Sequence, residues 1–148
     1  YAGGSFLNFI KLNHGRIVVG RVNLFVYGTL MSGFDLNGVL TRDEGEKVRD
    51  AELDEFDLYV VLGEGYPYII PGKGRVKGEI WDIPRNRLRT IDIVENVSSK
   101  LYRREGVTTV DGTECHAYVW GGKDFPAAQI DHGDFRRYYR EATDINRQ

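Results

Sequence analysis

The most informative stretch of the chain joins an apolar run to a glycine: Val22-Asn23-Leu24-Phe25-Val26-Tyr27-Gly28-Thr29-Leu30. The β-branched and aromatic residues at its start are typical of a buried strand, predicted over residues 22–27. Gly28 allows a sharp turn and leaves main-chain N–H groups uncovered by a Cβ atom. N–H groups that face outward together can hold a carboxylate or a phosphate. The stretch therefore predicts either the floor of a small-molecule site or an ordinary strand-to-loop turn.

Length and composition limit the class of protein. The chain has 148 residues and 41% hydrophobic residues, enough for one domain with a packed core. We expect residues 1–20 to be an N-terminal extension of unknown role and residues 21–148 to form a single domain. The net charge of −2 gives no broad basic field, so nucleic acid is not an expected partner. No apolar run approaches the roughly 20 residues of a membrane span, so a membrane partner is not expected either.

The sequence lacks the motifs of several large enzyme classes. The single cysteine, Cys115, excludes an internal disulfide, which is consistent with a cytoplasmic location. His14, His116 and His132 do not have the spacing of metal ligands, so no metal or other cofactor is expected. There is no Gly-x-Ser-x-Gly elbow of the serine hydrolases and no phosphate-binding P-loop.

The remaining sequence predicts a β-rich domain. Its 18 glycines and 12% aromatic residues are typical of short strands joined by tight turns. The segment 51–62 is expected to form one strand or two. Further strands are expected at 68–70, 76–83, 102–110 and 114–120, with a basic turn at 72–75. Helical turns are expected within 35–42 and near Phe135, Tyr138 and Tyr139. The main helix is expected over about 85–95, where Leu88 and Ile91 share an apolar face. The fold class is therefore α+β: a small mixed β-barrel with one main helix and short flanking helices.

Glu95 is the candidate catalytic residue. It lies on or next to the apolar face of the expected helix, where a carboxylate is either hydrogen-bonded or acquires a raised pKa. A raised pKa suits a general acid or base near neutral pH. The alternative is a solvated glutamate at the helix rim, paired with Arg103 or Arg104.

Tyr102, at the start of the next expected strand, is the second candidate on this side of the site. Its hydroxyl could orient a substrate or hold the Glu95 carboxylate. The alternative is an ordinary core aromatic residue, as for Tyr118 and Trp120.

Several motifs occur in an order that resembles a known family. They are the Tyr27-Gly28-Thr29-Leu30 loop, Gly65-Tyr66-Pro67, the segment 71–81 that ends in Gly78-Glu79-Ile80-Trp81, Ile91-Asp92-Ile93-Val94-Glu95, the Tyr102-Arg103-Arg104 strand and Gly133-Asp134-Phe135-Arg136. Together they resemble the γ-glutamylcyclotransferase-like superfamily, most closely its γ-glutamylamine cyclotransferase and AIG2-like branch, over roughly residues 22–140. Asn96 stands where the family often has glycine.

The resemblance implies a compact mixed β-barrel and a reaction that needs no water. In active members the α-amine of a γ-glutamyl amine or peptide attacks its own γ-carbonyl, which releases 5-oxoproline and a free amine. By this likeness, Gly28, Thr29 and Leu30, with Tyr27, would hold the substrate's α-carboxylate. Glu95 would take a proton from the α-ammonium and return one to the leaving amine.

Physical chemistry is consistent with this expectation. Ring closure is intramolecular, so the protein has to fold the substrate and move protons, without a cofactor.

The segments 31–46, 63–67 and 121–132 are expected to shape the side that receives the leaving amine. The alternative is a non-catalytic small-molecule-binding protein that retains the carboxylate-binding loop. A third option is hydrolysis or γ-glutamyl transfer in the same site. The expected partner is a small-molecule γ-glutamyl substrate, and the expected state is a monomer or a weak homodimer.

Overall fold

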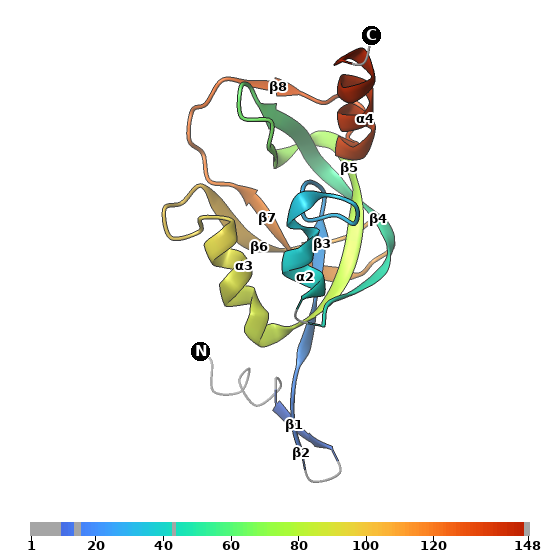
Figure 1. The fold of residues 1–148 in the computed structure, drawn as a ribbon, viewed down its shortest axis with the longest axis vertical. Coiled ribbons are helices and arrows are strands. Elements are labelled where there is room, and N and C mark those ends of the chain that lie inside the picture. The colour runs from blue at the N-terminus through green and yellow to red at the C-terminus, as the bar shows by residue number, and fades with distance from the viewer. Residues whose placement is uncertain (1–9, 14–15, 43, 147–148) are drawn as a thin grey trace.

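The computed structural model describes residues 10–13, 16–42 and 44–146. Of the expected extension 1–20, residues 1–9 and 14–15 lie outside the described residues. The strands β1 (Ile10–Asn13) and β2 (Arg16–Val19) pair antiparallel as a separate two-stranded sheet. Figure 1 shows this pair at one end of the molecule, below the body.

The body of the molecule is a six-stranded sheet that curls into a half-barrel (Figure 1). Its spatial order is β6-β7-β3-β5-β4-β8. The strands are β3 (Arg21–Val26), β4 (Glu46–Val61), β5 (Pro67–Pro84), β6 (Tyr102–Thr108), β7 (Glu114–Trp120) and β8 (Ala127–Gln129). All neighbours run antiparallel except β3 and β7, which are parallel and pair through Leu24 and His116. The strand expected at 22–27 is therefore at the centre of the sheet, with a partner on each side.

The prediction of two short strands separated by a basic turn at 72–75 was wrong. A single 18-residue strand, β5, runs through this segment and pairs with β4. The glycines do not form a turn but allow the Asp57 side chain of β4 to approach the β5 backbone closely. A Cβ at Gly72 would lie 2.1 Å from Asp57 Oδ2. The N–H of Gly74 donates to Asp57 Oδ1 at 2.8 Å. A Pro-Gly-Lys-Gly run is typical of a turn, but this contact from the neighbouring strand is invisible in the sequence.

The helices are short. The turn expected within 35–42 is present as the 3₁₀ helix η1 (Asp35–Asn37) and α2 (Gly38–Thr41). The helix expected over 85–95 is present as η2 (Arg85–Arg87) and α3 (Leu88–Val94). It is not the longest helix, because α4 (Phe135–Asn146) has 12 residues and α3 has seven. The first turn of this helical segment, Arg85–Arg87, is a 3₁₀ helix. The α-helical part therefore begins only at Leu88 and is shorter than the apolar spacing predicts.

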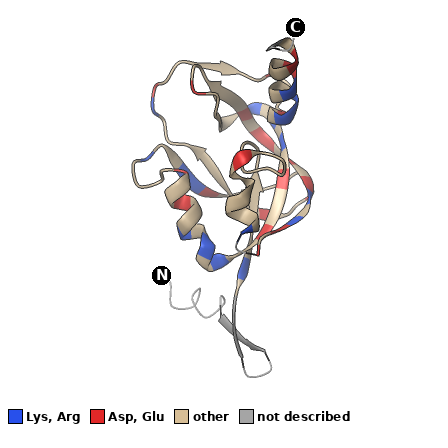
Figure 2. Cartoon of the chain, viewed as in Figure 1, with Lys and Arg blue, Asp and Glu red and all other residues tan. Residues whose placement is uncertain are grey.

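The core is built on the central strands and on α3. Leu24 and Phe25 of β3, Ile80 of β5, Ile91 of α3 and Ala117 of β7 are all at most 1% exposed. Over the described residues, no helix is long and apolar enough to cross a membrane. Basic and acidic residues are interspersed along the surface elements (Figure 2), as the small net charge indicates.

Candidate active site

A cavity of about 190 Å³ opens where β3 ends. Every residue that the sequence singled out for the site lines it: Tyr27, Gly28, Thr29, Leu30, Glu95 and Tyr102. The first four come from the β3 end and the loop after it, Glu95 from the end of α3, and Tyr102 from the start of β6. Segments about 70 residues apart therefore meet, because β3 and β6 both pack against β7.

The loop after β3 presents its main chain to the cavity. The N–H of Met31 donates to Gly28 O at 3.0 Å, which closes a turn over residues 28–31. A Cβ at Gly28 would lie 2.4 Å from Cγ of Pro67, so only glycine fits against this ring. Among the described residues, no acceptor pairs with the N–H groups of Gly28, Thr29 or Leu30. These donors line the cavity and are chemically suited to an anion.

Glu95 caps the C-terminal end of α3, where its N–H donates to Ile91 O at 2.9 Å. Its side chain makes no hydrogen bond or ion pair with any residue in the described part of the chain. Arg104 instead pairs with Asp92, and Arg103 with Glu105, so the alternative of a Glu95–arginine pair is not observed. Burial raises the pKa of the Glu95 carboxyl to about 7. The group can thus accept and release a proton near neutral pH.

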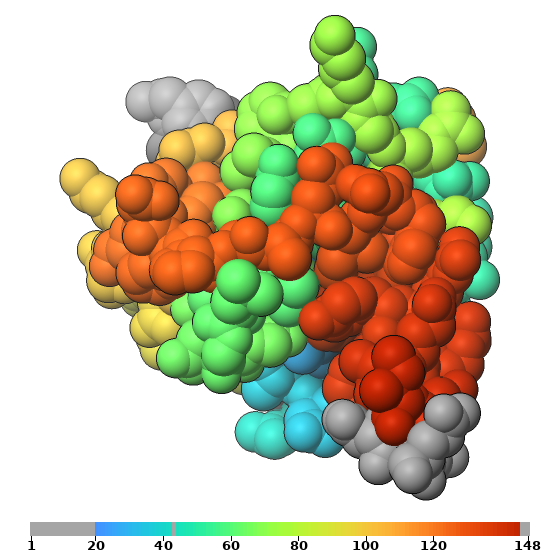
Figure 3. Space-filling view, turned by 90° about the horizontal axis from the view of Figure 1, so that it is seen from above, coloured from blue at the N-terminus to red at the C-terminus, as the bar shows by residue number. Residues whose placement is uncertain are grey.

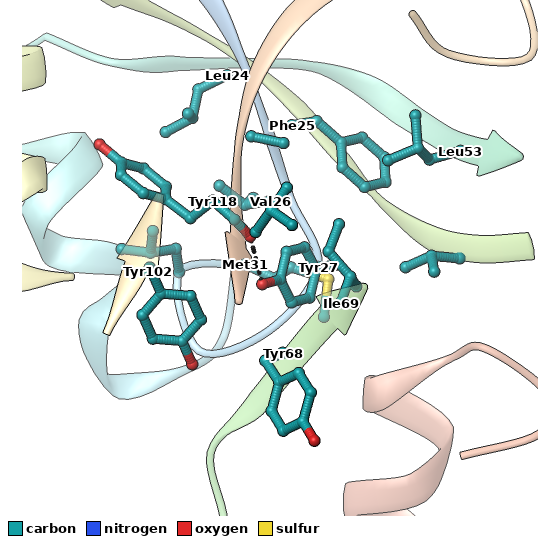
Figure 4. Packing of buried hydrophobic residues seen from close by; sticks show 14 of the residues in the cluster. Leu24, Phe25, Val26, Tyr27, Met31, Leu53, Tyr68, Ile69, Tyr102 and Tyr118 are labelled. Carbon is teal, nitrogen blue, oxygen red and sulfur yellow. Dashed lines mark hydrogen bonds between the residues drawn. The ribbon is translucent and has the colours of Figure 1, made fainter. Parts of the chain in front are cut away.

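Three buried tyrosines surround the carboxyl, and each hydroxyl is used elsewhere. Tyr27 donates to the carbonyl of Tyr118 at 2.6 Å (Figure 4), Tyr102 to the carbonyl of Pro67 at 2.6 Å, and Tyr118 to Asp92 Oδ1 at 2.7 Å. Burial is the main cause that raises the pKa of all three hydroxyls; Asp92 raises that of Tyr118 further, and the charge of Glu95 adds a smaller effect to each. The phenols are therefore neutral. Because each hydroxyl already donates to another acceptor, none of them hydrogen-bonds to the Glu95 carboxylate.

Asn96 follows Glu95 with a left-handed backbone, at φ 53°. Glycine and asparagine adopt this conformation at lower cost than other residues. The position where the resembling family often has glycine thus keeps a residue that permits the same turn. This turn ends α3 and directs Glu95 toward the cavity.

Several lining residues were not picked out individually from the sequence. Leu36 and Tyr66 come from the expected segments 31–46 and 63–67, whereas no lining residue comes from 121–132. Tyr118, Leu101 and Pro67 also line the cavity. The Gly65-Tyr66-Pro67 motif was the only signal for this wall, because tyrosine and leucine in strands are ordinarily core residues.

Metal ligands do not gather in this region or in any other described segment: no group of three or more His, Cys, Asp and Glu side chains is placed to hold an ion.

Fold and site define the class of protein: an α+β half-barrel in which a glycine loop and a buried glutamate share one cavity. The chain belongs to the family "Gamma-glutamyl cyclotransferase, AIG2-like", whose model matches residues 24–137. This match confirms the resemblance found in the sequence.

Two curated relatives support this assignment. One, from Pyrococcus horikoshii, is called "Putative gamma-glutamylcyclotransferase PH0828" and is 30% identical over 115 residues, which are 77% of this chain and 90% of the relative. A "Putative gamma-glutamylcyclotransferase" of Vibrio cholerae is 30% identical over 114 residues, 76% and 93% of the two chains.

Solved structures agree with the fold. The Pyrococcus horikoshii protein superposes with a TM-score of 0.68 at 27% identity, over 82% of this chain and 96% of its own. An AIG2-like protein from Mus musculus superposes with a TM-score of 0.58 at 28% identity, over 67% and 76% of the two chains. The expected fold class is thereby confirmed.

Proposed function

We propose that this protein is a cyclotransferase that cleaves a γ-glutamyl amine or peptide and releases 5-oxoproline and a free amine. One observation carries the proposal: the unpartnered Glu95 carboxyl, with a pKa of about 7, lines the same cavity as the unpaired N–H groups of the 28–30 loop. If the loop holds the carboxylate of a small molecule, the rest of that molecule lies in the cavity that Glu95 lines.

In the proposed reaction, the α-carboxylate of the substrate binds the N–H groups of Gly28, Thr29 and Leu30. The Glu95 carboxylate takes a proton from the α-ammonium, whose nitrogen then forms a bond to the γ-carbonyl carbon. The bond from that carbon to the leaving nitrogen breaks as Glu95 returns the proton to this nitrogen. The ring nitrogen still carries a second proton, which Glu95 transfers in the same way to the released amine, so that the products are the neutral lactam and an ammonium ion. No water is consumed, and the carboxyl ends in its starting state.

The geometry is consistent with carboxylate binding by the loop and proton transfer by Glu95. Neutral tyrosines and apolar side chains surround Glu95, so the carboxyl is poorly solvated and poised to exchange protons near pH 7. The loop donors come from the main chain and are fixed in place before substrate arrives, which reduces the entropy cost of orienting the amine.

Incubation with γ-glutamyl dipeptides and γ-glutamyl-lysine, followed by mass spectrometry, tests the proposal. Release of 5-oxoproline supports it, and release of glutamate identifies a hydrolase instead. Binding without either product identifies a non-catalytic carboxylate-binding protein.

A further inference from the structure

Behind the site loop lies a buried carboxylate that the proposed reaction does not use. Glu79 of β5 is 3% exposed, yet it carries a charged side chain in the interior of the sheet. Burial alone would raise its pKa, but hydrogen bonds from Ser32 and Trp81 and the nearby Lys47 outweigh burial and lower it. Glu79 is therefore ionised, and hydrogen bonds to an ionised carboxylate are stronger than those between neutral groups.

Glu79 is directed at Ser32, which follows the site loop by two residues. Its carboxylate accepts the Ser32 N–H at 2.9 Å and the Ser32 hydroxyl at 2.7 Å. Arg136 of α4 donates to the Ser32 carbonyl at 2.8 Å and to Glu79 Oε2 at 3.1 Å. All three polar atoms of Ser32 are therefore engaged by these two residues.

Packing from α4 adds to the same contact. The Arg136 guanidinium lies 5.1 Å from the centre of the Phe34 ring, and the Phe135 ring lies 5.6 Å from it. In Figure 3 the orange-red C-terminal segment and the blue-to-cyan segment after β3 emerge side by side. The chain from Ser32 to Phe34 is thus held by α4 on one side and by β5 on another.

Glu79 and Arg136 do not line the candidate active site but a different cavity. Leu30 lines the cavity that holds Glu95, whereas Met31 lines a second cavity together with Glu79 and Arg136. Consecutive residues of this loop therefore line two different cavities. A side chain that fixes the loop from the second cavity can set the directions of its N–H groups without touching substrate.

We propose that Glu79 and Arg136 are positioning residues, which act through Ser32 to fix the carboxylate-binding loop of the active site. The inference rests on the proposed function, because it assigns the loop a substrate to hold. The effect concerns substrate binding and not proton transfer, since neither residue contacts Glu95. Loss of such uniform binding raises KM and leaves kcat largely unchanged.

Ser32→Ala and Arg136→Gln test the proposal, because each removes contacts to the loop while the buried Glu79 is retained. We expect each to raise KM by about 5-fold or more and to leave kcat within about 2-fold. The dissociation constant of 5-oxoproline, measured by calorimetry, should rise in parallel. The apparent pKa near 7 in the pH profile should stay in place, because Glu95 is untouched. Glu79→Gln should have a larger effect of the same kind.

Arg21→Gln provides the matched control. It breaks the 2.8 Å ion pair with Asp82. This pair joins β3 to β5 at the start of β3, whereas the loop follows the end of β3. We expect a lower melting temperature with an unchanged KM. If Ser32→Ala and Arg136→Gln also lower only the melting temperature, the positioning role is wrong. If the unmodified protein neither binds 5-oxoproline nor produces it, the proposed function itself fails, and this outcome is distinct.

Discussion

The hydroxyl of Tyr27 donates a 2.6 Å hydrogen bond to the main-chain carbonyl of Tyr118. This bond joins the buried residue that directly follows β3 to β7, the strand that runs parallel to β3. It fixes the start of the site loop and occupies the hydroxyl, which therefore does not hydrogen-bond to Glu95. Tyr27 thus shapes the cavity, and the Glu95 carboxyl keeps the raised pKa that burial gives it.

Replacement of Glu95 by glutamine should abolish proton transfer and retain the shape of the side chain. We expect kcat to fall by roughly 10²–10⁴-fold, the usual contribution of a general acid or base. In the unmodified protein kcat should rise with pH through an apparent pKa of about 7, as Glu95 ionises. Glu105→Gln, on exposed β6, is the control and should retain full activity. Equal rates of 5-oxoproline release for Glu95→Gln and the unmodified protein would contradict the mechanism.

The same glutamate should make stability fall with rising pH. Its pKa of about 7 in the folded protein lies above the ordinary 4.5, so the folded state retains a proton that the unfolded chain releases. The stabilisation is complete below about pH 4.5 and is lost as pH rises through 7. The difference between 4.5 and about 7 amounts to roughly 3–4 kcal/mol, at about 1.4 kcal/mol per pKa unit.

Urea denaturation of the unmodified protein and of Glu95→Gln at several pH values measures this difference. The glutamine variant should be the more stable of the two above pH 7. His116, whose pKa burial lowers, titrates in both proteins, so the difference between the two curves isolates Glu95. Parallel curves would show that the Glu95 carboxyl has an ordinary pKa.

Gly28→Ala should weaken substrate binding through a steric clash. The new Cβ would lie 2.4 Å from the Pro67 ring, so either the loop or the β5 end must move. We expect a loss of stability of roughly 1–3 kcal/mol, typical of overpacking, and a raised KM. Gly106→Ala in β6 is the matched control, because no atom lies within 4 Å of a Cβ there. Thermal unfolding and steady-state kinetics distinguish the two variants.

Tyr102→Phe should affect stability more than proton transfer. The substitution leaves the buried carbonyl of Pro67 without its 2.6 Å donor, at a cost of roughly 1–3 kcal/mol. The apparent pKa of the activity profile should be unchanged, because the hydroxyl does not bond to Glu95. A shift of that pKa by more than about half a unit would instead indicate that Tyr102 hydrogen-bonds to the carboxylate during the reaction.

Asn96→Val should disturb the end of α3, whereas Asn96→Gly should be tolerated. The backbone at this position has φ 53°, a conformation that costs a β-branched residue roughly 1–2 kcal/mol. Because Asn96 follows Glu95 directly, kcat should fall in the valine variant as the carboxyl is displaced. Circular dichroism melting curves and kinetics of both variants provide the measurement. Equal behaviour of valine and glycine would show that the turn does not position Glu95.

The central strand, the glycine loop after it, the helix that ends at Glu95 and the 102–120 hairpin were all predictable from the sequence. These are local features: side-chain periodicity, a glycine at a strand end and an Asp-Gly turn act over a few residues. The family was also predictable, because several motifs that occur in one order along the chain are far more specific than any one of them alone.

The partners of these residues, by contrast, depend on the packing of distant segments. The 72–75 segment has the composition of a turn, yet it is a strand because Asp57 of β4 contacts its glycines. Glu95 could have paired with Arg103 or Arg104, but those side chains bind Glu105 and Asp92 instead. Burial without a partner, which raises the pKa of Glu95 to about 7, depends on residues far along the chain. The network that joins Glu79, Ser32 and Arg136 spans more than 100 positions for the same reason. Such contacts follow from how strands and helices pack, and no local pattern encodes them.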